Sequence, residues 1–359
     1  MLDHVTPFFA LFACILVLFA LGWHIRSRNV GTITLSLYLF FGNLDNFVNS
    51  VAWWSTAEDK APGFCEVSIR LRHALYIAIP ASNLVIARKL ESIASTRQVR
   101  ASASEHKKSI IIDLLISVGL PVLYVSLMIV NQTNRYGIIE QVGCWPFLSL
   151  SWVWVLLVAA PVLIVSFASA VYSVLAFRWF WIRRRQFQAV LASSASTLNK
   201  ARYIRLLVLT AIDMLLFFPI YVGSVSDTIR GAITTSYVSW SYVHTGFSYI
   251  PQFSAEVMEM QPSFKARLIL SRLVCPISAY IFFAMFGLGQ EARQGYKHAV
   301  LKALVFCKLR KERQKPIQNH IVANIEVVTF QSRETSGGID GSPHSEKFSI
   351  NTPTKYEEA

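Results

Sequence analysis

The residues of this chain that could do chemistry are amide and ionisable side chains set inside long apolar runs. Residues 42–49 read GNLDNFVN, and single charged residues recur in later apolar runs. In a hydrocarbon environment such groups turn inward and pair with one another or face a polar cavity. We predict that six of them form a polar network between helices, with an ion path as the alternative: Asn43, Asp45, Asn46, Asn49, Asp213 and Arg272.

Metal and catalytic chemistry are not indicated. His73 and His244 have no second ligand at a zinc-like spacing, so we predict that each is structural or lines a pocket. The chain contains no G-x-S-x-G, H-E-x-x-H or C-x-x-C motif and no glycine-rich phosphate loop. We therefore predict that the protein is not an enzyme and has no metal site and no cofactor.

Two arginines, Arg70 and Arg72, follow the start of the third apolar run. They could pair with an acidic group such as Glu256 or Glu259. Alternatively, their aliphatic stems could extend the guanidinium groups to the outer membrane interface. The sequence leaves both interpretations open.

Seven apolar runs must position these residues. The chain is 53% hydrophobic and only 15% charged, and the runs reach the roughly 20 residues that a helix needs to cross a bilayer. The net charge of +13 lies mainly in short loops between the runs, which argues against a nucleic-acid partner. The approximate ranges are 5–23, 32–54, 66–90, 110–130, 151–181, 203–225 and 268–290.

Lysine and arginine alternate between the two sides of these runs. The segments after the first, third, fifth and seventh runs are basic, whereas the others hold few such residues. Basic loops stay in the cytoplasm during insertion. The pattern predicts an all-α seven-transmembrane helix bundle over residues 1–290, with its N-terminus outside and its C-terminus cytoplasmic. We predict a basic juxtamembrane segment over 291–315 and a disordered tail over 316–359.

This topology separates the cysteines. Of the five in the chain, only Cys65 and Cys144 fall on the outer side, where disulfides form. We predict a bridge between them, with two free buried thiols as the alternative. The triplet Asn131-Gln132-Thr133 is a glycosylation acceptor on the same side, close to the end of the fourth run.

Several segments, taken together and in order, resemble one known family. They read WHIRSRNVGT after the first run, FFGNLDNFVNSVAWW in the second, IPASNLVIARKL in the third, VGCWPF before the fifth, FRWFWIRRRQF after it, and YVHTGFSYIPQF with FFAMFGLGQEARQGY around the seventh. The chain resembles the fungal lipopeptide (a-factor type) mating-pheromone receptors, which are class D G-protein-coupled receptors. The resemblance covers about residues 7–305. Arg272-Leu273 departs from the family, because a Trp is expected in this pair.

The resemblance implies a plasma-membrane receptor for a peptide whose C-terminal Cys is farnesylated. A prenyl chain needs an apolar, aromatic-lined site with a few polar groups that fix the peptide. The alternative role for the outer aromatic residues is an interface belt around the bundle. The candidate ligand-binding residues are Arg70, His73, Trp145, Trp152, Trp240, Tyr242, His244, Phe247, Tyr249 and Phe253.

The resemblance also implies that the inner side binds the Gα subunit of a heterotrimeric G protein. The basic inner loops suit that role, although they also set topology and contact anionic membrane lipid. A homodimer stays open, and so does the rival class of polytopic transporter or channel, which would need a continuous polar path. The candidate G-protein contacts are Arg88, Arg183, Arg184, Arg185, Phe187, Arg202 and Arg205.

Overall fold

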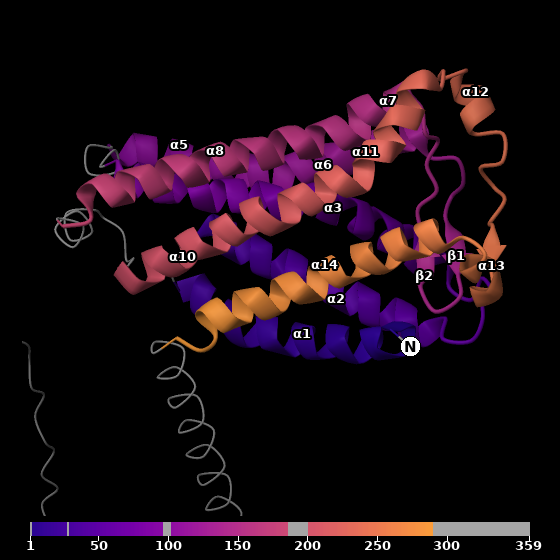
Figure 1. Cartoon of the computed structure of the whole chain (residues 1–359), viewed down its shortest axis with the longest axis horizontal. Helices are drawn as coiled ribbons and strands as arrows, with labels where there is room; N and C mark the ends of the chain where they lie inside the picture. Colours follow the sequence, from indigo (N-terminus) through magenta and orange to yellow (C-terminus); the bar gives the residue numbers. More distant parts are fainter. Residues whose placement is uncertain (1, 27–28, 96–101, 186–199, 290–359) are drawn as a thin grey trace, which may run out of the picture. The chain divides into compact units, whose positions relative to one another are not determined.

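Long helices dominate the computed structural model of the chain (Figure 1), which describes residues 2–26, 29–95, 102–185 and 200–289. All of these residues belong to one unit that spans residues 1–295. Three long helices are α-helical throughout: α1 (Leu2–Arg26), α2 (Val30–Ala52) and α3 (Pro62–Ala94). So is the last one, α14 (Pro262–Phe286).

Three further helical segments each contain a π-helical stretch. They are α5–η1–α6 (Ala103–Leu114, Leu115–Gly119, Leu120–Met128), α7–η3–α8 (Trp152–Trp154, Val155–Ala159, Ala160–Arg183) and α10–η4–α11 (Lys200–Ile212, Asp213–Phe217, Phe218–Thr234). Each π stretch ends two residues before a proline: Pro121, Pro161 or Pro219. Proline lacks an N–H and clashes with the preceding turn, and a widened turn absorbs both defects.

Among the described residues, five helices are long and apolar enough to cross a membrane: Val5–Gly22, Ser104–Asn131, Trp152–Arg183, Lys200–Gly223 and Pro262–Phe286. The chain is therefore a helical membrane protein. The predicted second and third spans, α2 and α3, are not among the five because their buried faces are polar. Asn43, Asp45 and Asn49 are buried on α2, and Ser82 and Asn83 on α3.

The α3 helix forms the core of the bundle. Every residue from 81 to 87 is buried, and α3 packs against α2, α6, α8 and α10. Close packing also joins α2 to α14, where a Cβ added to Gly42 would lie 2.7 Å from the Cys275 sulfur. The middle of the bundle is therefore a dense, tightly fitted core.

Two helices begin well before the predicted apolar runs: α14 starts at Pro262 rather than near 268, and α5 starts ahead of the fourth run. The fourth run was expected over 110–130, but α5 starts at Ala103. Ser102 accepts a hydrogen bond from the Glu105 amide at 3.3 Å, and Glu105 accepts one from the Ser102 amide at 2.6 Å. This S-x-x-E capping box fixes the helix start ahead of the apolar residues.

A small sheet lies at one end of the bundle (Figure 1), which we call the strand end. Its order is β2 (Gly143–Trp145), β1 (Gly137–Ile139), β3 (Gln252–Phe253); β1 is antiparallel to β2 and parallel to β3. The short elements η2 (Ile129–Asn131), α12 (Trp240–Val243) and α13 (Ala255–Glu259) complete the connections there. The strand end thus brings together two connections that are far apart in the sequence.

Candidate functional site

A disulfide attaches the strand end to the bundle. Cys65 in the first turn of α3 is bonded to Cys144 in β2, with 5.2 Å between the two Cα atoms, and both residues are fully buried. The predicted bridge is confirmed. It fixes the β1–β2 hairpin over the ends of α2 and α3.

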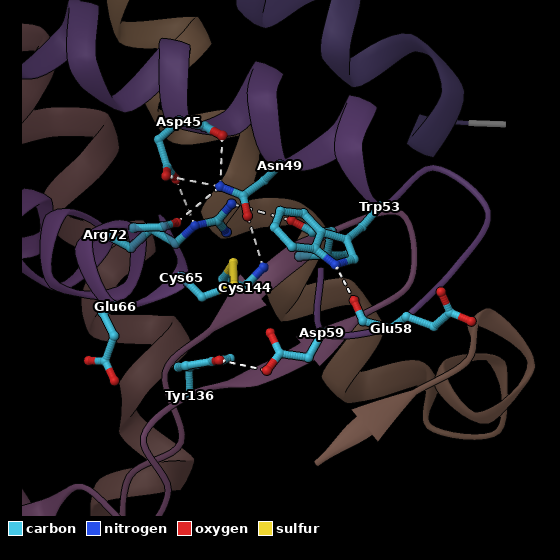
Figure 2. The surroundings of a disulfide bond; sticks show 12 residues. Asp45, Asn49, Trp53, Glu58, Asp59, Cys65, Glu66, Arg72, Tyr136 and Cys144 are labelled. Carbon is cyan, nitrogen blue, oxygen red and sulfur yellow. Dashed lines mark hydrogen bonds and ion pairs between the residues drawn. A yellow bond between two sulfur atoms is a disulfide. The ribbon is translucent and has the colours of Figure 1, made fainter. Parts of the chain in front are cut away.

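A buried ion pair lies close to this disulfide (Figure 2). Arg72 Nε donates to Asp45 Oδ2 at 2.8 Å, and Asn49 Nδ2 donates to Asp45 Oδ1 at 2.9 Å and to Ser68 Oγ at 3.0 Å. The Arg72 and Asp45 side chains are only 9% and 4% exposed. Buried charges of this kind must be paired, because removing one partner leaves an uncompensated ion.

The ion pair also contacts the hairpin and holds it in place. Arg72 Nη2 donates to the Val142 carbonyl at 3.3 Å, and its guanidinium lies 5.5 Å from the centroid of the Trp145 ring. The Cys144 amide donates to Asn49 Oδ1 at 2.8 Å. Asp45, Asn49 and Arg72 therefore position the hairpin as well as pairing α2 with α3.

Gly143 is required for this approach. Its φ is +81°, and an added Cβ would lie 2.2 Å from Asn49 Oδ1. Only glycine fits both the left-handed backbone and the contact.

Of the two interpretations of Arg72, pairing with an acidic group is confirmed, but the partner is Asp45. The suggested partners Glu256 and Glu259 are wrong, and Glu259 pairs with Lys265 instead. Arg72 also does not extend to the outer interface, because its side chain is buried. The sequence did contain a signal for this pair. At a rise of 1.5 Å per residue, Asp45 lies roughly 10 Å from the end of α2 and Arg72 roughly 15 Å from the start of α3. Because a short loop joins these two helix ends, the two side chains lie at similar depths.

Arg70 lies outside this cluster. It forms an i,i+4 pair with Glu66 and is about half exposed, and Glu66 Oε1 also accepts from Arg135 Nε at 2.8 Å. Nearby, the Tyr136 hydroxyl donates to Asp59 Oδ2 at 2.8 Å. Burial and the adjacent Asp59 carboxylate raise the pKa of Tyr136 to about 12, so it remains a donor at neutral pH. These contacts close the loop before α3 against the hairpin.

The other polar residues on α2 face α14. Asn46 Nδ2 donates to the Arg272 carbonyl at 3.1 Å, Arg272 Nη2 donates to Ser50, and Asn43 Nδ2 donates to the Cys275 carbonyl at 3.3 Å. Asp213 is separate from this group, and Asn83 of α3 is its polar neighbour. The structure thus divides the predicted network: Asp45 and Asn49 bond toward α3, Asn43 and Asn46 bond toward α14 with Arg272, and Asp213 belongs to neither group.

The ten ligand candidates do not form one cluster. Among the inward-facing ones, His73 is 1% exposed and stacks on Tyr124 at 4.7 Å, Trp145 faces Arg72, and Phe253 stacks on Phe147 at 5.6 Å. His244 stacks on Trp240 at 4.0 Å, and its two ring nitrogens lie near the Trp240 and Ile129 carbonyls; Phe247 is partly buried beside it. The outward-facing aromatic candidates are more than half exposed: Trp152, Trp240, Tyr242 and Tyr249.

The side chain of the predicted glycosylation acceptor is not exposed to solvent. Asn131 is fully buried at the end of η2, and neither polar side-chain atom is bonded to another described residue. The sequence motif alone could not indicate this burial.

At the opposite end of the bundle, side chains of α8 and α10 donate hydrogen bonds to backbone carbonyls of neighbouring helices. We call this the arginine end, after Arg183 and Arg205. Arg183 Nη1 donates to the Ala94 carbonyl at 3.1 Å, and Arg205 Nη1 donates to the Met285 carbonyl at 3.4 Å. The fully buried Tyr203 hydroxyl lies 3.3 Å from both the Leu90 and Ala176 carbonyls. These contacts join α10 to α3, α8 and α14.

The remaining candidate G-protein contacts lie in different parts of the structure. Arg184 lies 4.5 Å from the Trp181 ring centroid, and Arg185 and Arg202 are near the same helix ends. Arg88 instead pairs with Asp113 of α5 at 2.6 Å. Phe187 lies outside the described residues, as do the predicted segments 291–315 and 316–359.

Comparison with known proteins decides the family. Residues 5–307 match the family described as Pheromone A receptor. The chain belongs to the pheromone A receptor family. Pheromone receptor 1 of Mycosarcoma maydis is 64% identical to it over 359 residues, covering all of this chain and 97% of that protein.

More distant relatives match most of this chain. Pheromone B alpha 3 receptor of Schizophyllum commune is 36% identical over 83% of this chain and 48% of its own length. Pheromone a factor receptor of Saccharomyces cerevisiae is 28% identical over 80% of this chain and 59% of its own length. The chain thus spans about half of these two longer proteins. Membership in this family, which is not an enzyme family, supports a pheromone receptor role.

Proposed function

We infer that this protein is a plasma-membrane receptor for a farnesylated peptide pheromone and that it activates a heterotrimeric G protein. Our proposed topology has seven spans, including α2 and α3, with the N-terminus outside and the C-terminus in the cytoplasm. The strand end then faces outward and the arginine end inward. The observation that carries the proposal is that α3 is bonded to both ends.

The connection through α3 is continuous. Near its outer end, α3 holds the hairpin through Cys65 and Arg72. Near its inner end, the carbonyls of Leu90 and Ala94 accept hydrogen bonds from the Tyr203 hydroxyl and the Arg183 guanidinium. A shift of α3 caused by ligand at the strand end would therefore change the contacts that close the arginine end.

We place the peptide against the inward-facing group that includes His73, Trp145 and Phe253, with Arg70, His244 and Phe247 at its rim. The prenyl chain would lie on the exposed aromatic residues Trp152, Trp240, Tyr242 and Tyr249. Burial of the chain contributes roughly 0.8 kcal/mol per methylene, which makes it a main source of affinity. The transporter alternative gains no support from Asp45, because Arg72 and Asn49 occupy its two oxygens.

At the arginine end, we propose that Gα contacts Arg183, Arg184, Arg185, Phe187, Arg202 and Arg205. An apolar helix face of Gα could enter once α10 moves away from α3 and α8. Arg88 is a weaker candidate, since it faces α5 through its pair with Asp113.

The proposal is tested in a fungal host that lacks its own pheromone receptors but keeps the G-protein pathway. A panel of pheromone peptides is supplied in two forms, with and without the farnesyl group on the C-terminal cysteine. We expect a reporter response to one or more farnesylated peptides and none to their unfarnesylated forms. Silence across the panel from a receptor present at the cell surface, together with no Gα co-purifying with it, would contradict the proposal.

The topology is tested separately with epitope tags. We expect an N-terminal tag to bind antibody on intact cells and a C-terminal tag to bind only after permeabilisation. The reverse result would overturn the assignment of the two ends.

A further inference from the structure

A small cavity opens where α3, α5 and α8 meet near the arginine end. Its volume is about 170 Å³, and its polar lining includes Arg88, Lys89, His106, Ser109 and Asp113. Val30 and Tyr172 supply apolar walls. None of the contacts that hold the strand end or close the arginine end uses these side chains.

The cavity presents more hydrogen-bond donors than the described residues satisfy. All three hydrogen bonds of the Arg88 side chain come from Nη2, to Asp113 Oδ1 at 2.6 Å, to Ser109 O at 3.2 Å and to Ser109 Oγ at 3.3 Å. Its Nε and Nη1 donate to no described residue. The Lys89 ammonium likewise forms no hydrogen bond or ion pair within the described part of the chain.

The two carboxylates of the site lie deeper than the cations. The side chain of Asp113 is 9% exposed and that of Arg88 is 24% exposed, while the second carboxylate, Glu91, is 2% exposed. Asp113 therefore holds Nη2 of this cavity-lining guanidinium, and Nε and Nη1 keep donors that no described residue uses. Carboxylates that orient a cation in this way preorganise it for an anionic ligand.

The geometry points to a binding site for a phosphomonoester group, in which Arg88 and Lys89 donate to the phosphate oxygens. A phosphate offers the planar guanidinium two parallel acceptors and can accept from the ammonium with a third oxygen. A singly charged carboxylate would leave more of the donors unused. The phosphomonoester could belong to an inositol lipid headgroup or to a soluble inositol phosphate.

The topology of our proposed function favours the lipid source, because it places this cavity at the cytoplasmic leaflet. That leaflet carries the anionic lipids and attracts basic segments. Lys107 and Lys108 of α5 are exposed next to the cavity and would add to that attraction. Binding at the cavity itself does not depend on which side it faces.

Purified receptor is placed in phosphatidylcholine nanodiscs, and bound molecules are counted by native mass spectrometry. Three probes are compared: phosphatidylinositol 4-phosphate in the disc, phosphatidylserine in the disc, and soluble inositol 1,4-bisphosphate. We expect saturable binding of the phosphoinositide and little of phosphatidylserine, which has no phosphomonoester. Equal binding of the two lipids would overturn the inference; tight binding of the soluble probe would support the site and assign the soluble source.

Matched variants locate the binding. Lys89→Gln should weaken binding of the phosphoinositide roughly 13- to 160-fold, because a charge-assisted hydrogen bond contributes roughly 1.5–3 kcal/mol. Lys89→Arg should retain binding. Lys107→Gln removes the same charge from the exposed face of α5 and should change affinity less than about twofold, since a surface charge contributes little.

Equal losses in Lys89→Gln and Lys107→Gln would mean general attraction to a basic face and would overturn the site. If Lys89→Gln does not fold, competition between the soluble and lipid probes on the unmodified receptor decides whether one saturable site exists. No pheromone or G protein is present in these measurements. A failed pheromone response therefore bears on the proposed function, and failed phosphate binding bears on the cavity.

Discussion

At the residue scale, the Asp45–Arg72 pair explains why charged residues are tolerated inside this bundle. Each ionic group loses water on burial, and the loss is offset only when the partner and additional hydrogen bonds are in place. Asn49 and the Val142 carbonyl supply those bonds, and Ser68 in turn accepts a hydrogen bond from Asn49. Breaking the pair should lower the free energy of unfolding, and this loss can be measured.

Asp45→Asn should strongly destabilise the receptor, because it leaves the Arg72 guanidinium buried without a counter-ion. The expected loss is about 3–5 kcal/mol in the free energy of unfolding. Replacing both residues, as Asp45→Asn with Arg72→Met, should recover much of that loss. Thermal unfolding of the detergent-purified protein measures all of these variants.

Glu66→Gln is the matched control, since it breaks the more exposed pairs with Arg70 and Arg135. Its effect should stay under about 1 kcal/mol. If the losses from Asp45→Asn and Arg72→Met simply add in the double variant, the two side chains are not coupled and the account of this pair is wrong.

At the element scale, the β1–β2 hairpin is too short to hold its position alone. Each strand has three residues, and an isolated two-stranded hairpin is at best marginally stable. The disulfide, the Asn49 contact to the Cys144 amide and the pairing of β3 with β1 together fix it. The hairpin therefore depends on long-range contacts.

Cys65→Ser and Cys144→Ser should each destabilise the receptor by about 2–5 kcal/mol, because the bridge closes a long loop in the unfolded chain. The double variant should be no less stable than either single one, since one bridge is lost in every case. Thermal unfolding gives the stability, and peptide mapping without reducing agent reports the bridge. Cys14→Ser changes a buried free thiol on α1 and should leave the mapped bridge intact. A double variant much worse than the singles would contradict a shared bond.

At the scale of the whole molecule, the two ends of the bundle are linked through α3. The structure has its arginine end closed by hydrogen bonds to carbonyls on α3, α8 and α14. If this is the inactive arrangement of the proposed receptor, weakening the closure should favour the signalling state without ligand. The closure depends most on Tyr203, which is fully buried and reaches two helices.

Tyr203→Phe should raise reporter output in the absence of pheromone about fivefold, which corresponds to one lost hydrogen bond of roughly 1 kcal/mol. Tyr237→Phe is the control, because that hydroxyl donates to the Val130 carbonyl at the strand end, at 3.4 Å. It should leave basal output unchanged. Equal basal output from both variants at equal surface levels would show that Tyr203 does not restrain signalling.

The sequence by itself determined the class of the protein and several of its local features. The lengths of the apolar runs predicted the long helices, because the bilayer sets a minimum span and backbone groups in lipid must be satisfied within the helix. The side-to-side distribution of Lys and Arg left only Cys65 and Cys144 on the outer side, which led to the correct disulfide. The motifs in order indicated the receptor family. The S-x-x-E signal at Ser102 was also present, although the apolar pattern alone set the predicted helix start too late.

Only the tertiary structure decided which polar groups meet. Helix periodicity shows which residues share a face, but it does not show which helix lies opposite. Arg72 therefore pairs with Asp45 on the preceding helix rather than with Glu256 or Glu259, and Asp213 lies near Asn83, apart from the polar residues of α2. The burial of Asn131 and the paired strands β1 and β3 likewise depend on segments distant in the sequence. Such contacts are set by the packing of the whole bundle, in which each buried polar group takes the partner that the surrounding helices bring within reach.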